Sequence, residues 1–338
     1  MQLIFLPDIC FFNTTYKSKA IKNFKNFLIR LNKLFPNSNF VSNLECVLLK
    51  KKTKSHSKKL TMLDAEHVFA KFLKQNKINN VCLANNHSFD FGIKGFKQTA
   101  KHLNKEKINY FGAGKNIDDA KKPLILKSAK KNLAIFGLSY KPEASIKKAG
   151  VLSLKKNSSI EIIKKFKSKN KNFFVVAYCH SGLELFEYPL KRDEIIYKKL
   201  IDSGCDIVIG SHPHRIQGVE KYKKKFIFYS IGDLFFNNIR KVDWVKYLTP
   251  PAHAAFYKKN LKQKLLFQSL IIKIDCIKNK INVYQVKRNT NFKYEIKKIS
   301  NTQLDKNVIK FKKILSNNKN LKIRNNIEKK IFYNANIS

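Results

Sequence analysis

Short runs of β-branched and aromatic residues alternate with longer amphipathic segments along most of this chain. This alternation is typical of an α/β fold in which helices cover buried strands. The predicted strands span 3–6, 39–42, 81–84, 133–138, 173–179, 207–210 and 226–230, and the predicted helices span 20–34, 63–75, 94–105, 159–167 and 191–202. Each predicted strand ends where polar residues begin, at the place where open α/β sheets bind ligands.

The last third of the chain has a different pattern. Residues 265–274 and 281–287 read as two strands joined through Asn279, which predicts a hairpin. From about Ser300 the chain is rich in lysine and asparagine, which predicts a surface helix or a partly ordered tail. We therefore expect one main domain over 1–295 and a basic, partly ordered C-terminal extension over 296–338.

The formal net charge of +46 would attract any polyanion. However, the lysines are spread from end to end, arginine is scarce, and asparagine, isoleucine and phenylalanine are also abundant. Readers of nucleic acid usually exploit the bidentate fork of arginine, and they gather their charge in one stripe. A drift in composition therefore explains the charge best, and we expect an anionic substrate but no specific nucleic-acid partner.

Membrane and disulfide signals are both weak. No run reaches the roughly 18 to 20 apolar residues that cross a bilayer, so we expect no transmembrane segment. The apolar residues 3–6 lead almost at once into Pro7-Asp8, which predicts a first strand instead of a signal peptide and favours a cytoplasmic location. The six cysteines have no CxxC spacing, so we expect buried free thiols in a reducing compartment.

The predicted strand 207–210 leads into the segment Ser211-His212-Pro213-His214. The two histidines follow a glycine and are two positions apart, so both imidazoles can project from one loop at the sheet edge. Imidazole nitrogen is a good ligand for zinc, manganese or iron. A turn with two solvent-facing histidines is the alternative, and this segment alone leaves it open.

Two more predicted strands end in histidine-containing segments. Strand 173–179 leads into His180, with Glu184 four residues later, and strand 81–84 leads into Asn86 and His87. An asparagine can offer its amide oxygen to a metal, and a histidine can act as a general acid or donate to a developing oxyanion. A lone histidine at a strand end is more often structural, but its recurrence favours a shared site.

Two acidic residues complete the candidate set. Asp8 follows the first predicted strand, and Glu45 follows the second. Acids in such places commonly cap the next element. In a chain with 23 acidic against 69 basic residues, their placement after the first two strands still makes both of them candidate ligands.

Seven segments follow one another along the chain in a recognisable order. They are Asp8, Asn43-Leu44-Glu45, Ala84-Asn85-Asn86-His87 with Asp90 and Gly92, Gly112-Ala113-Gly114, His180-Ser181-Gly182-Leu183-Glu184, Gly210-Ser211-His212-Pro213-His214 and Tyr229-Ser230-Ile231-Gly232-Asp233. Over residues 1–290 this order resembles the capsule synthesis protein CapA family. That family is associated with poly-γ-glutamate capsule formation, and the resemblance implies a fold of the calcineurin-like metallophosphoesterase superfamily, an α/β/β/α sandwich with mixed sheets.

The resemblance also implies roles for individual residues. The residues that would surround one or two divalent metal ions (Mn, Fe or Zn) are Asp8, Glu45, Asn86, His180, His212 and His214. His87 would be the nearby acid or oxyanion donor. Asp90 and Glu184 would face the substrate or orient a ligand imidazole.

This sequence departs from the family pattern at three positions. Pro7 stands where the family usually has glycine, and Asp233 stands where it usually has asparagine. Cys10 stands where the wider superfamily has a histidine, so one metal position is expected to be weak or empty. Cys10 could ligate through its thiolate, although a buried thiol is the favoured interpretation.

The leading functional hypothesis is a CapA-like capsule biosynthesis protein with a metal-dependent, phosphoesterase-type hydrolase site. Its substrate would be a phosphoester or a related polyanion. The alternative is a non-catalytic accessory protein that binds or handles an anionic polymer such as polyglutamate. Nucleic-acid binding through the lysine surface ranks third, because it leaves the histidines unexplained.

Overall fold

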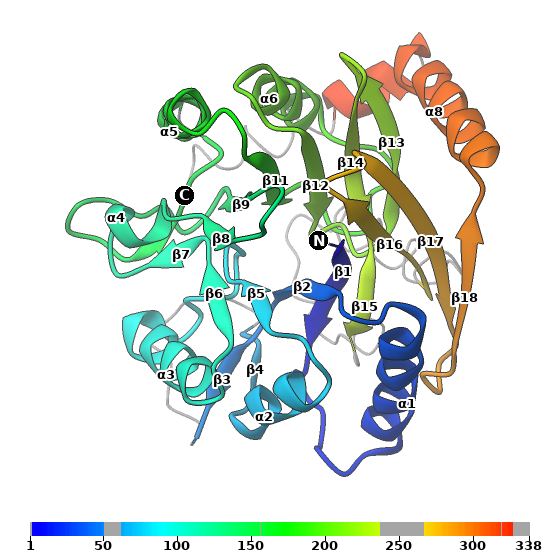
Figure 1. Cartoon of the computed structure of the whole chain (residues 1–338). Coiled ribbons are helices and arrows are strands. Elements are labelled where there is room, and N and C mark those ends of the chain that lie inside the picture. The colour runs from blue at the N-terminus through cyan, green and yellow to red at the C-terminus, as the bar shows by residue number, and fades with distance from the viewer. Residues whose placement is uncertain (1, 51–61, 156, 237–266, 319, 327–338) are drawn as a thin grey trace.

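Two mixed β-sheets lie face to face at the centre of the molecule, and helices cover their outer faces (Figure 1). The computed structural model describes residues 2–50, 62–155, 157–236, 267–318 and 320–326. The arrangement confirms the expected α/β class and the α/β/β/α sandwich with mixed sheets.

The larger sheet has its central strands at the N-terminal end of the chain. In order it contains β18 (Tyr294–Ile299), β17 (Lys280–Arg288), β16 (Gln268–Asp275), β1 (Gln2–Cys10), β2 (Asn39–Leu44), β5 (Asn80–Cys82) and β6 (Asn109–Phe111), and β15 (Asp233–Phe236) also pairs with β1. The strands from β1 to β6 run parallel, whereas β16, β17 and β18 pair antiparallel. The late hairpin expected from the sequence is therefore β16 and β17, although Leu265 lies outside the described residues.

The second sheet carries the later parallel strands. In order it contains β13 (Ile216–Tyr222), β14 (Lys225–Ile231), β12 (Ile207–Ser211), β11 (Phe174–His180), β9 (Leu133–Ser139) and β8 (Leu124–Leu126). Strands β9, β11, β12 and β14 are parallel. Two small pairs lie beside the main sheets, β3 (Val47–Leu49) with β4 (Asp64–Glu66) and β7 (Ala113–Gly114) with β10 (Gly150–Val151).

Alternate side chains of β11 enter two different cores. Val176 and Tyr178 face the layer between the sheets, where the Tyr178 hydroxyl donates to the Leu6 carbonyl oxygen at 3.1 Å. Val175 and Ala177 belong to the outer layer beneath the helices. Because side chains of a strand alternate between faces, one buried run lines both layers and fixes the register of the strand.

The helices pack their apolar stripes on the outer faces of the sheets (Figure 1). They are α1 (Lys19–Leu34), α2 (Val68–Gln75), α3 (Gly92–Lys105), α4 (Ile117–Ala120), α5 (Asn157–Lys169), α6 (Lys191–Asp202) and α8 (Asn301–Ser316). In α1, Phe24, Phe27 and Leu31 recur at helical spacing and are buried, and the Ser18 side chain accepts from the Ile21 amide at the N-cap.

One predicted helix begins later than expected. Residues 64–66 of the predicted helix 63–75 form β4, which pairs with β3, so α2 begins only at Val68. Strand pairing with a neighbouring segment therefore overrides the local helical pattern. The other predicted helices match α1, α3, α5 and α6 with small changes at their ends.

The segment after Ser300 forms a helix that packs on the second sheet. Ser300 caps α8 by accepting from the Gln303 amide, and Phe311 is buried against Gly218 of β13. The boundary at 295/296 falls within β18, and the division into a main domain and an extension stays a prediction.

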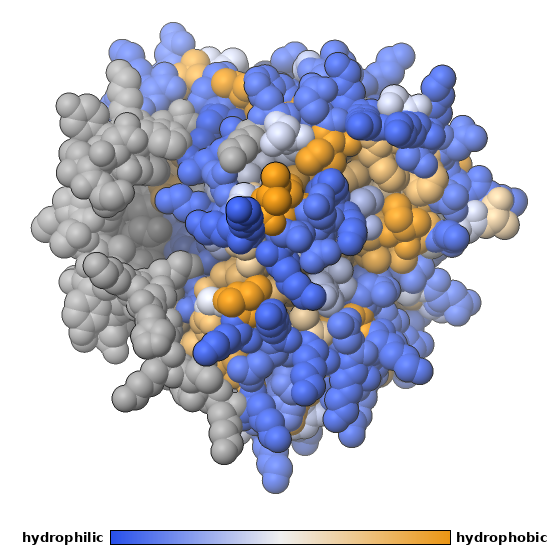
Figure 2. All heavy atoms as spheres, turned by 90° about the vertical axis from the view of Figure 1, so that its left-hand side faces the viewer, coloured by the Kyte–Doolittle hydropathy of each residue, from blue (hydrophilic) through white to orange (hydrophobic). Residues whose placement is uncertain are grey.

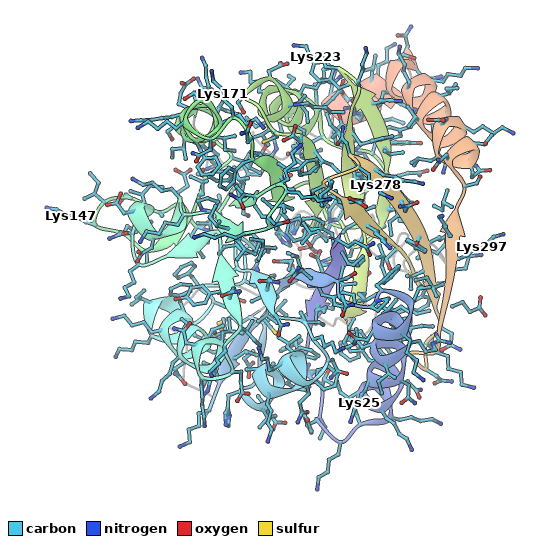
Figure 3. All side chains as sticks on the ribbon, viewed as in Figure 1. Lys25, Lys147, Lys171, Lys223, Lys278 and Lys297 are labelled. Atoms are coloured by element: carbon cyan, nitrogen blue, oxygen red, sulfur yellow. The ribbon has the colours of Figure 1, made fainter. Side chains whose placement is uncertain are left out.

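The positions of the cysteines and lysines agree with the expectations from the sequence. The six cysteines are free and buried. Lysines project from well-separated sides of the molecule, as Lys25, Lys147 and Lys278 illustrate (Figure 3). Within the described ranges, no helix is both long and apolar enough to cross a membrane.

Candidate metal centre

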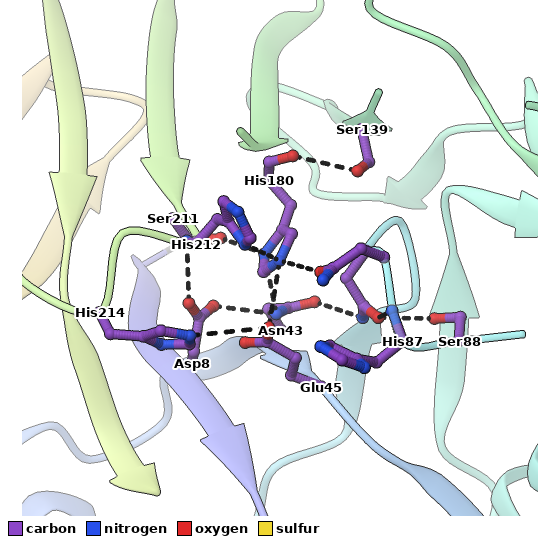
Figure 4. Close-up of polar contacts among 12 residues, drawn as sticks. Asp8, Asn43, Glu45, His87, Ser88, Ser139, His180, Ser211, His212 and His214 are labelled. Carbon is purple, nitrogen blue, oxygen red and sulfur yellow. Dashed lines mark hydrogen bonds and ion pairs between the residues drawn. The ribbon is translucent and has the colours of Figure 1, made fainter. Parts of the chain in front are cut away.

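Polar side chains from both sheets meet at the carboxyl ends of the central strands (Figure 4). Asp8 lies in β1 and Glu45 directly follows β2, while His180 ends β11 and His212 and His214 follow β12. We call these five residues the donor cluster. Asp8, Glu45, His180 and His214 are at most 4% exposed, so the cluster is withdrawn from solvent.

Glu45 lies at the centre of the donor cluster. Ligand atoms of Glu45, His180 and His212 lie within 4.8 Å of one another, and so do those of Asp8, Glu45 and His214. Glu45 Oε1 is 3.3 Å from His180 Nε2 and 3.9 Å from His214 Nε2. The sequence prediction that these residues gather in one place agrees with this geometry. Because Glu45 belongs to both groups, it is suited to bridge two cations.

The donor cluster lacks a positive charge of its own. Glu45 is fully buried, and neither of its carboxylate oxygens accepts a hydrogen bond from any described residue. A buried carboxylate in this state is costly unless a cation compensates it. The residues therefore fit a divalent cation, although imidazole and carboxylate ligands do not distinguish Mn, Fe and Zn.

Burial favours the uncharged form of each side chain in the donor cluster. Burial raises the pKa of Glu45 well above its ordinary range, and burial followed by the charge of Glu45 raises the pKa of Asp8 to about 7. Burial also lowers the pKa of His180 to about 4, and it lowers those of His212 and His214 well below the ordinary value. The imidazoles are therefore neutral at physiological pH, which is the form that binds metals.

Asparagine amides connect the ligands behind the donor cluster. Asn43 Nδ2 donates to Asp8 Oδ1 at 2.9 Å, and Asn85 Nδ2 donates to Asn43 Oδ1 at 2.9 Å and to the Leu44 carbonyl oxygen at 2.9 Å. These contacts fix the first carboxylate and the turn that presents Glu45. Asn43 and Asn85 were not among the predicted site residues, and the only signal was their place inside the Asn-Leu-Glu and Asn-Asn-His segments.

His180 is held through both ring nitrogens. Its Nδ1 lies 3.0 Å from Ser211 Oγ, and its Nε2 lies 2.9 Å from Asn86 Oδ1 and 3.0 Å from His212 Nδ1. When Nδ1 carries the proton and donates to Ser211, Nε2 keeps a lone pair for a cation. The amide oxygen of Asn86 points at the same place, so the structure brings this predicted ligand to the donor cluster.

His87 lies beside the donor cluster and is paired with Asp90. His87 Nδ1 is 2.6 Å from Asp90 Oδ2, and the same oxygen accepts from the Leu63 amide at 2.8 Å. The residue is 8% exposed, and the pair leaves Nε2 outside the contact with Asp90. This arrangement suits a histidine that exchanges a proton with a substrate atom.

Glu184 lies at the margin of the site. Its side chain is half-buried in the loop that follows β11, and its charge raises the pKa of both Glu45 and His180. Glu184 is not in either of the ligand groups formed by the described residues. Its position fits a group that faces the substrate better than a metal ligand.

The loop after β12 holds His212 and His214 in unusual backbone conformations. His212 has φ 97° and His214 has φ 55°, which are in the left-handed region and strained for a residue with a side chain. The His212 amide donates to Asp8 Oδ2 at 3.0 Å, and the Pro213 carbonyl oxygen accepts from the Leu185 amide at 2.9 Å. A Cβ at Gly182 would lie 2.9 Å from Pro213 Cγ, so only glycine allows these loops to pack so closely.

The departures from the family pattern have a structural basis at two positions. Cys10 is a buried thiol whose pKa is raised well above its ordinary value by burial, and it belongs to neither ligand group of the described residues. Asp233 lies beside Asp8 in the β1 and β15 register, and Arg288 Nη2 donates to Asp233 Oδ2 at 2.9 Å. A buried guanidinium thus neutralises the extra acid.

Sequence comparison identifies the family. The family described as "Bacterial capsule synthesis protein PGA_cap" matches residues 2–238, which include every residue of the donor cluster. This chain belongs to that family. The family assignment agrees with the resemblance that the sequence segments indicated.

Named relatives of this family member come from several bacteria. "Capsule biosynthesis protein CapA" of Bacillus anthracis is 33% identical over 210 residues, covering 60% of this chain and 51% of that protein. "PGA biosynthesis protein CapA" of Bacillus subtilis is 26% identical over 277 residues, covering 78% and 71%. A "probable polyglutamine synthesis accessory protein" of Mycobacterium tuberculosis is 27% identical over 169 residues, covering 46% and 44%. The chain spans about half the length of the Bacillus anthracis protein.

One solved structure resembles this PGA_cap family member at low sequence identity. The crystal structure of TT1561 of Thermus thermophilus is 8% identical, with a TM-score of 0.43. The superposition covers 83% of this chain and 97% of that one.

Proposed function

We propose that this protein is a metal-dependent, phosphoesterase-type hydrolase that acts in the biosynthesis of an anionic capsule polymer such as poly-γ-glutamate. The observation that carries the proposal is the Glu45 carboxylate, which is buried, shared by two ligand groups and free of hydrogen bonds from the described residues. The named relatives support the biological setting.

The donor cluster and Asn86 would hold one or two divalent cations. Such ions, when bound, polarise a phosphoryl oxygen and make hydroxide available near neutral pH. The ligands come from β1, the turn after β2, the loop after β5, the end of β11 and the loop after β12, so the sheets fix their spacing before any substrate arrives. Preorganised groups of this kind need little rearrangement during a reaction.

His87 would provide the proton in this hydrolysis. Hydroxide, formed when water releases a proton to solvent, would form the new bond to phosphorus as the ester bond breaks, and a protonated His87 would deliver its proton to the leaving oxygen. Asp90 would keep the ring oriented through its 2.6 Å contact with Nδ1. Glu184 would face the substrate from the rim of the site, where its carboxylate can accept a hydrogen bond from a hydroxyl or amide group.

The test combines metal analysis with an activity screen. Purified protein should contain a divalent metal and should hydrolyse phosphomonoesters or phosphodiesters when manganese is added. His212→Ala should lose both properties, whereas His102→Ala, which changes a histidine outside the donor cluster, should keep them. A metal-loaded protein that hydrolyses no ester would contradict the enzymatic proposal.

A second candidate is a non-catalytic accessory role in which the site binds the carboxylates of an anionic polymer. The name of the Mycobacterium tuberculosis relative, which contains the words "accessory protein", favours it. Bound metal that strengthens the binding of a polyglutamate without any turnover would support this role.

A further inference from the structure

A lysine-lined groove lies on the outer surface beside the open edges of the two sheets. A depression of about 810 Å³ lies between α3, β6 and β8, and a second of about 550 Å³ lies between the start of α3 and the segment around Lys147. Lys97 and Lys115 line both depressions, so the two depressions adjoin at these lysines. We call this the lysine groove.

Positive charge lines the whole length of the lysine groove. The lysines that line it are Lys97, Lys101, Lys115, Lys122, Lys147 and Lys148. Lys97 and Lys101 are four positions apart in α3 and therefore share one face of the helix. The acid in the lining is Asp119, and Lys122 Nζ already lies 3.0 Å from its carboxylate. The groove thus offers an unbalanced row of ammonium groups.

Apolar side chains are interleaved with these lysines. Ile93 and Ile125 line the groove and are each 38% exposed, and Ile146, next to Lys147, is 79% exposed. Figure 2 shows this side of the molecule, where hydrophobic patches lie among hydrophilic residues. These side chains provide apolar contact surface between the lysine charges.

We propose that the lysine groove binds an extended carboxylate polymer, with Lys97 and Lys115 at its centre. The ammonium groups complement repeated carboxylates, and the apolar side chains contact the chain between them. Two connected depressions suit an extended polymer better than a single small anion. The choice of a carboxylate polymer rests on the proposed function, whereas the location of the groove rests on its own geometry.

Nucleic acid and anionic membranes fit the groove less well. The lining contains no arginine, and its aromatic rings pack on one another, because Phe89 stacks on Phe96 with ring centroids 4.7 Å apart and Tyr110 lies edge-on to Phe96. Rings occupied in this way offer no platform for bases. A concave surface also recedes from a flat bilayer.

The groove is linked to the proposed catalytic residues. Phe89 and Gly92 line the second depression, and Asp90, which contacts His87 Nδ1, lies between them in the same loop. A polymer held in the groove therefore lies against the outer side of the loop that positions His87. Binding in the groove would keep the polymer close to the protein while its end is presented to the site.

The experiment compares two variants of equal net charge. A labelled polyglutamate of defined length is titrated with Lys97→Gln/Lys115→Gln, and with Lys25→Gln/Lys297→Gln, whose exposed lysines lie on α1 and β18. The groove variant should bind about tenfold more weakly, as the loss of two exposed ion pairs predicts, and the control should change less than about twofold. All substituted lysines are exposed, so thermal unfolding should remain unchanged.

The possible outcomes separate this proposal from the proposed function. His212→Ala should keep polymer binding even if it loses metal, because the groove lies outside the donor cluster. Equal losses in both double variants would overturn the groove and leave only diffuse surface charge. Stronger groove-dependent binding of an oligonucleotide, or of vesicles containing anionic lipid, would overturn the choice of polymer.

Discussion

Two buried glutamates in this molecule have opposite surroundings. Glu194 on α6 accepts from Arg324 Nη2 at 2.7 Å and from Lys198 Nζ at 3.0 Å, whereas Glu45 is surrounded by imidazoles and other acids. Burial works to raise the pKa of Glu194, but the hydrogen bonds from Arg324 and Lys198 outweigh it and lower that pKa to about 2. Burial raises the pKa of Glu45 well above its ordinary range.

The difference indicates that a buried acid without a compensating cation can mark a functional site. The Glu194 region supplies its own cations, so it stabilises the fold without any external partner. The donor cluster has no such cation among the described residues and is complete only when one binds.

The largest expected effect is on folding stability. Arg324 is fully buried, and its Nε also donates to the Pro189 carbonyl oxygen at 2.8 Å. Arg324→Ala should lower the free energy of unfolding by about 3 kcal/mol, because it leaves Glu194 buried with one cation fewer. Urea unfolding measures this loss, and exposed Lys322→Ala is the charge-matched control. Equal stability of both variants would show that the C-terminal segment does not neutralise Glu194.

The next effect is on metal affinity. His212→Ala removes a ligand atom that lies within 4.8 Å of those of Glu45 and His180. Affinity for manganese should fall by about 100-fold, or roughly 2.7 kcal/mol. Removal of a residue that only supports a metal ligand already lowers metal affinity by about 10- to 100-fold, so removal of the ligand itself should cost at least as much. Isothermal titration calorimetry measures it, with His102→Ala as the control. An unchanged dissociation constant would remove His212 from the ligand set.

A third effect is a gain in the free energy of unfolding, whereas most substitutions of buried residues lower it. In metal-free protein at pH 8, Glu45→Gln should raise the free energy of unfolding by about 2 kcal/mol, because it removes an acid that is buried without hydrogen bonds from the described residues. Glu194→Gln should lower that free energy, since it removes an acid from the cations of Arg324, Lys198 and Lys191. Both values come from urea unfolding in the presence of a chelator. A loss of stability in both variants would mean that the two sites are electrostatically alike.

The smallest effect is the pH dependence of metal binding. Burial and the charge of Glu45 raise the pKa of Asp8 to about 7, so a proton must leave before its carboxylate can bind a cation. The proton on Asp8 alone should therefore lower metal affinity about tenfold for each pH unit below 7. Calorimetry in buffers of different ionisation enthalpy counts the released proton. Asp8→Asn should flatten the slope, and a slope that persists would assign the proton to another group.

The sequence was most informative for residue types that have few structural or chemical roles. The long apolar runs of β1, β11 and β12 predicted buried strands, and a histidine at the end of such a run is chemically specific. The sequence thus predicts His180 and His212 as ligands, and the structure places them together with Glu45. The geometry supports the prediction that these residues are ligands, and the experiments above test it.

Other parts of the site depend on contacts that no local pattern encodes. Asn43 and Asn85 look like ordinary turn residues in the sequence, yet their amides hold Asp8 and the Glu45 turn. Arg288 and Arg324 neutralise acids that are far from them along the chain. Strand β4 forms only because β3 is available as a partner, which is why the start of α2 was predicted too early.

The contact between the His212 amide and Asp8 Oδ2 has a consequence for how the protein is made. Asp8 is synthesised before its partners from β11 and β12, which leave the ribosome much later. Contacts between segments so distant in the chain form slowly, because a large loop must close first. A nascent chain therefore cannot assemble the complete set of ligands until the loop after β12 has emerged, and capture of a cation would mark the moment when both sheets have come together.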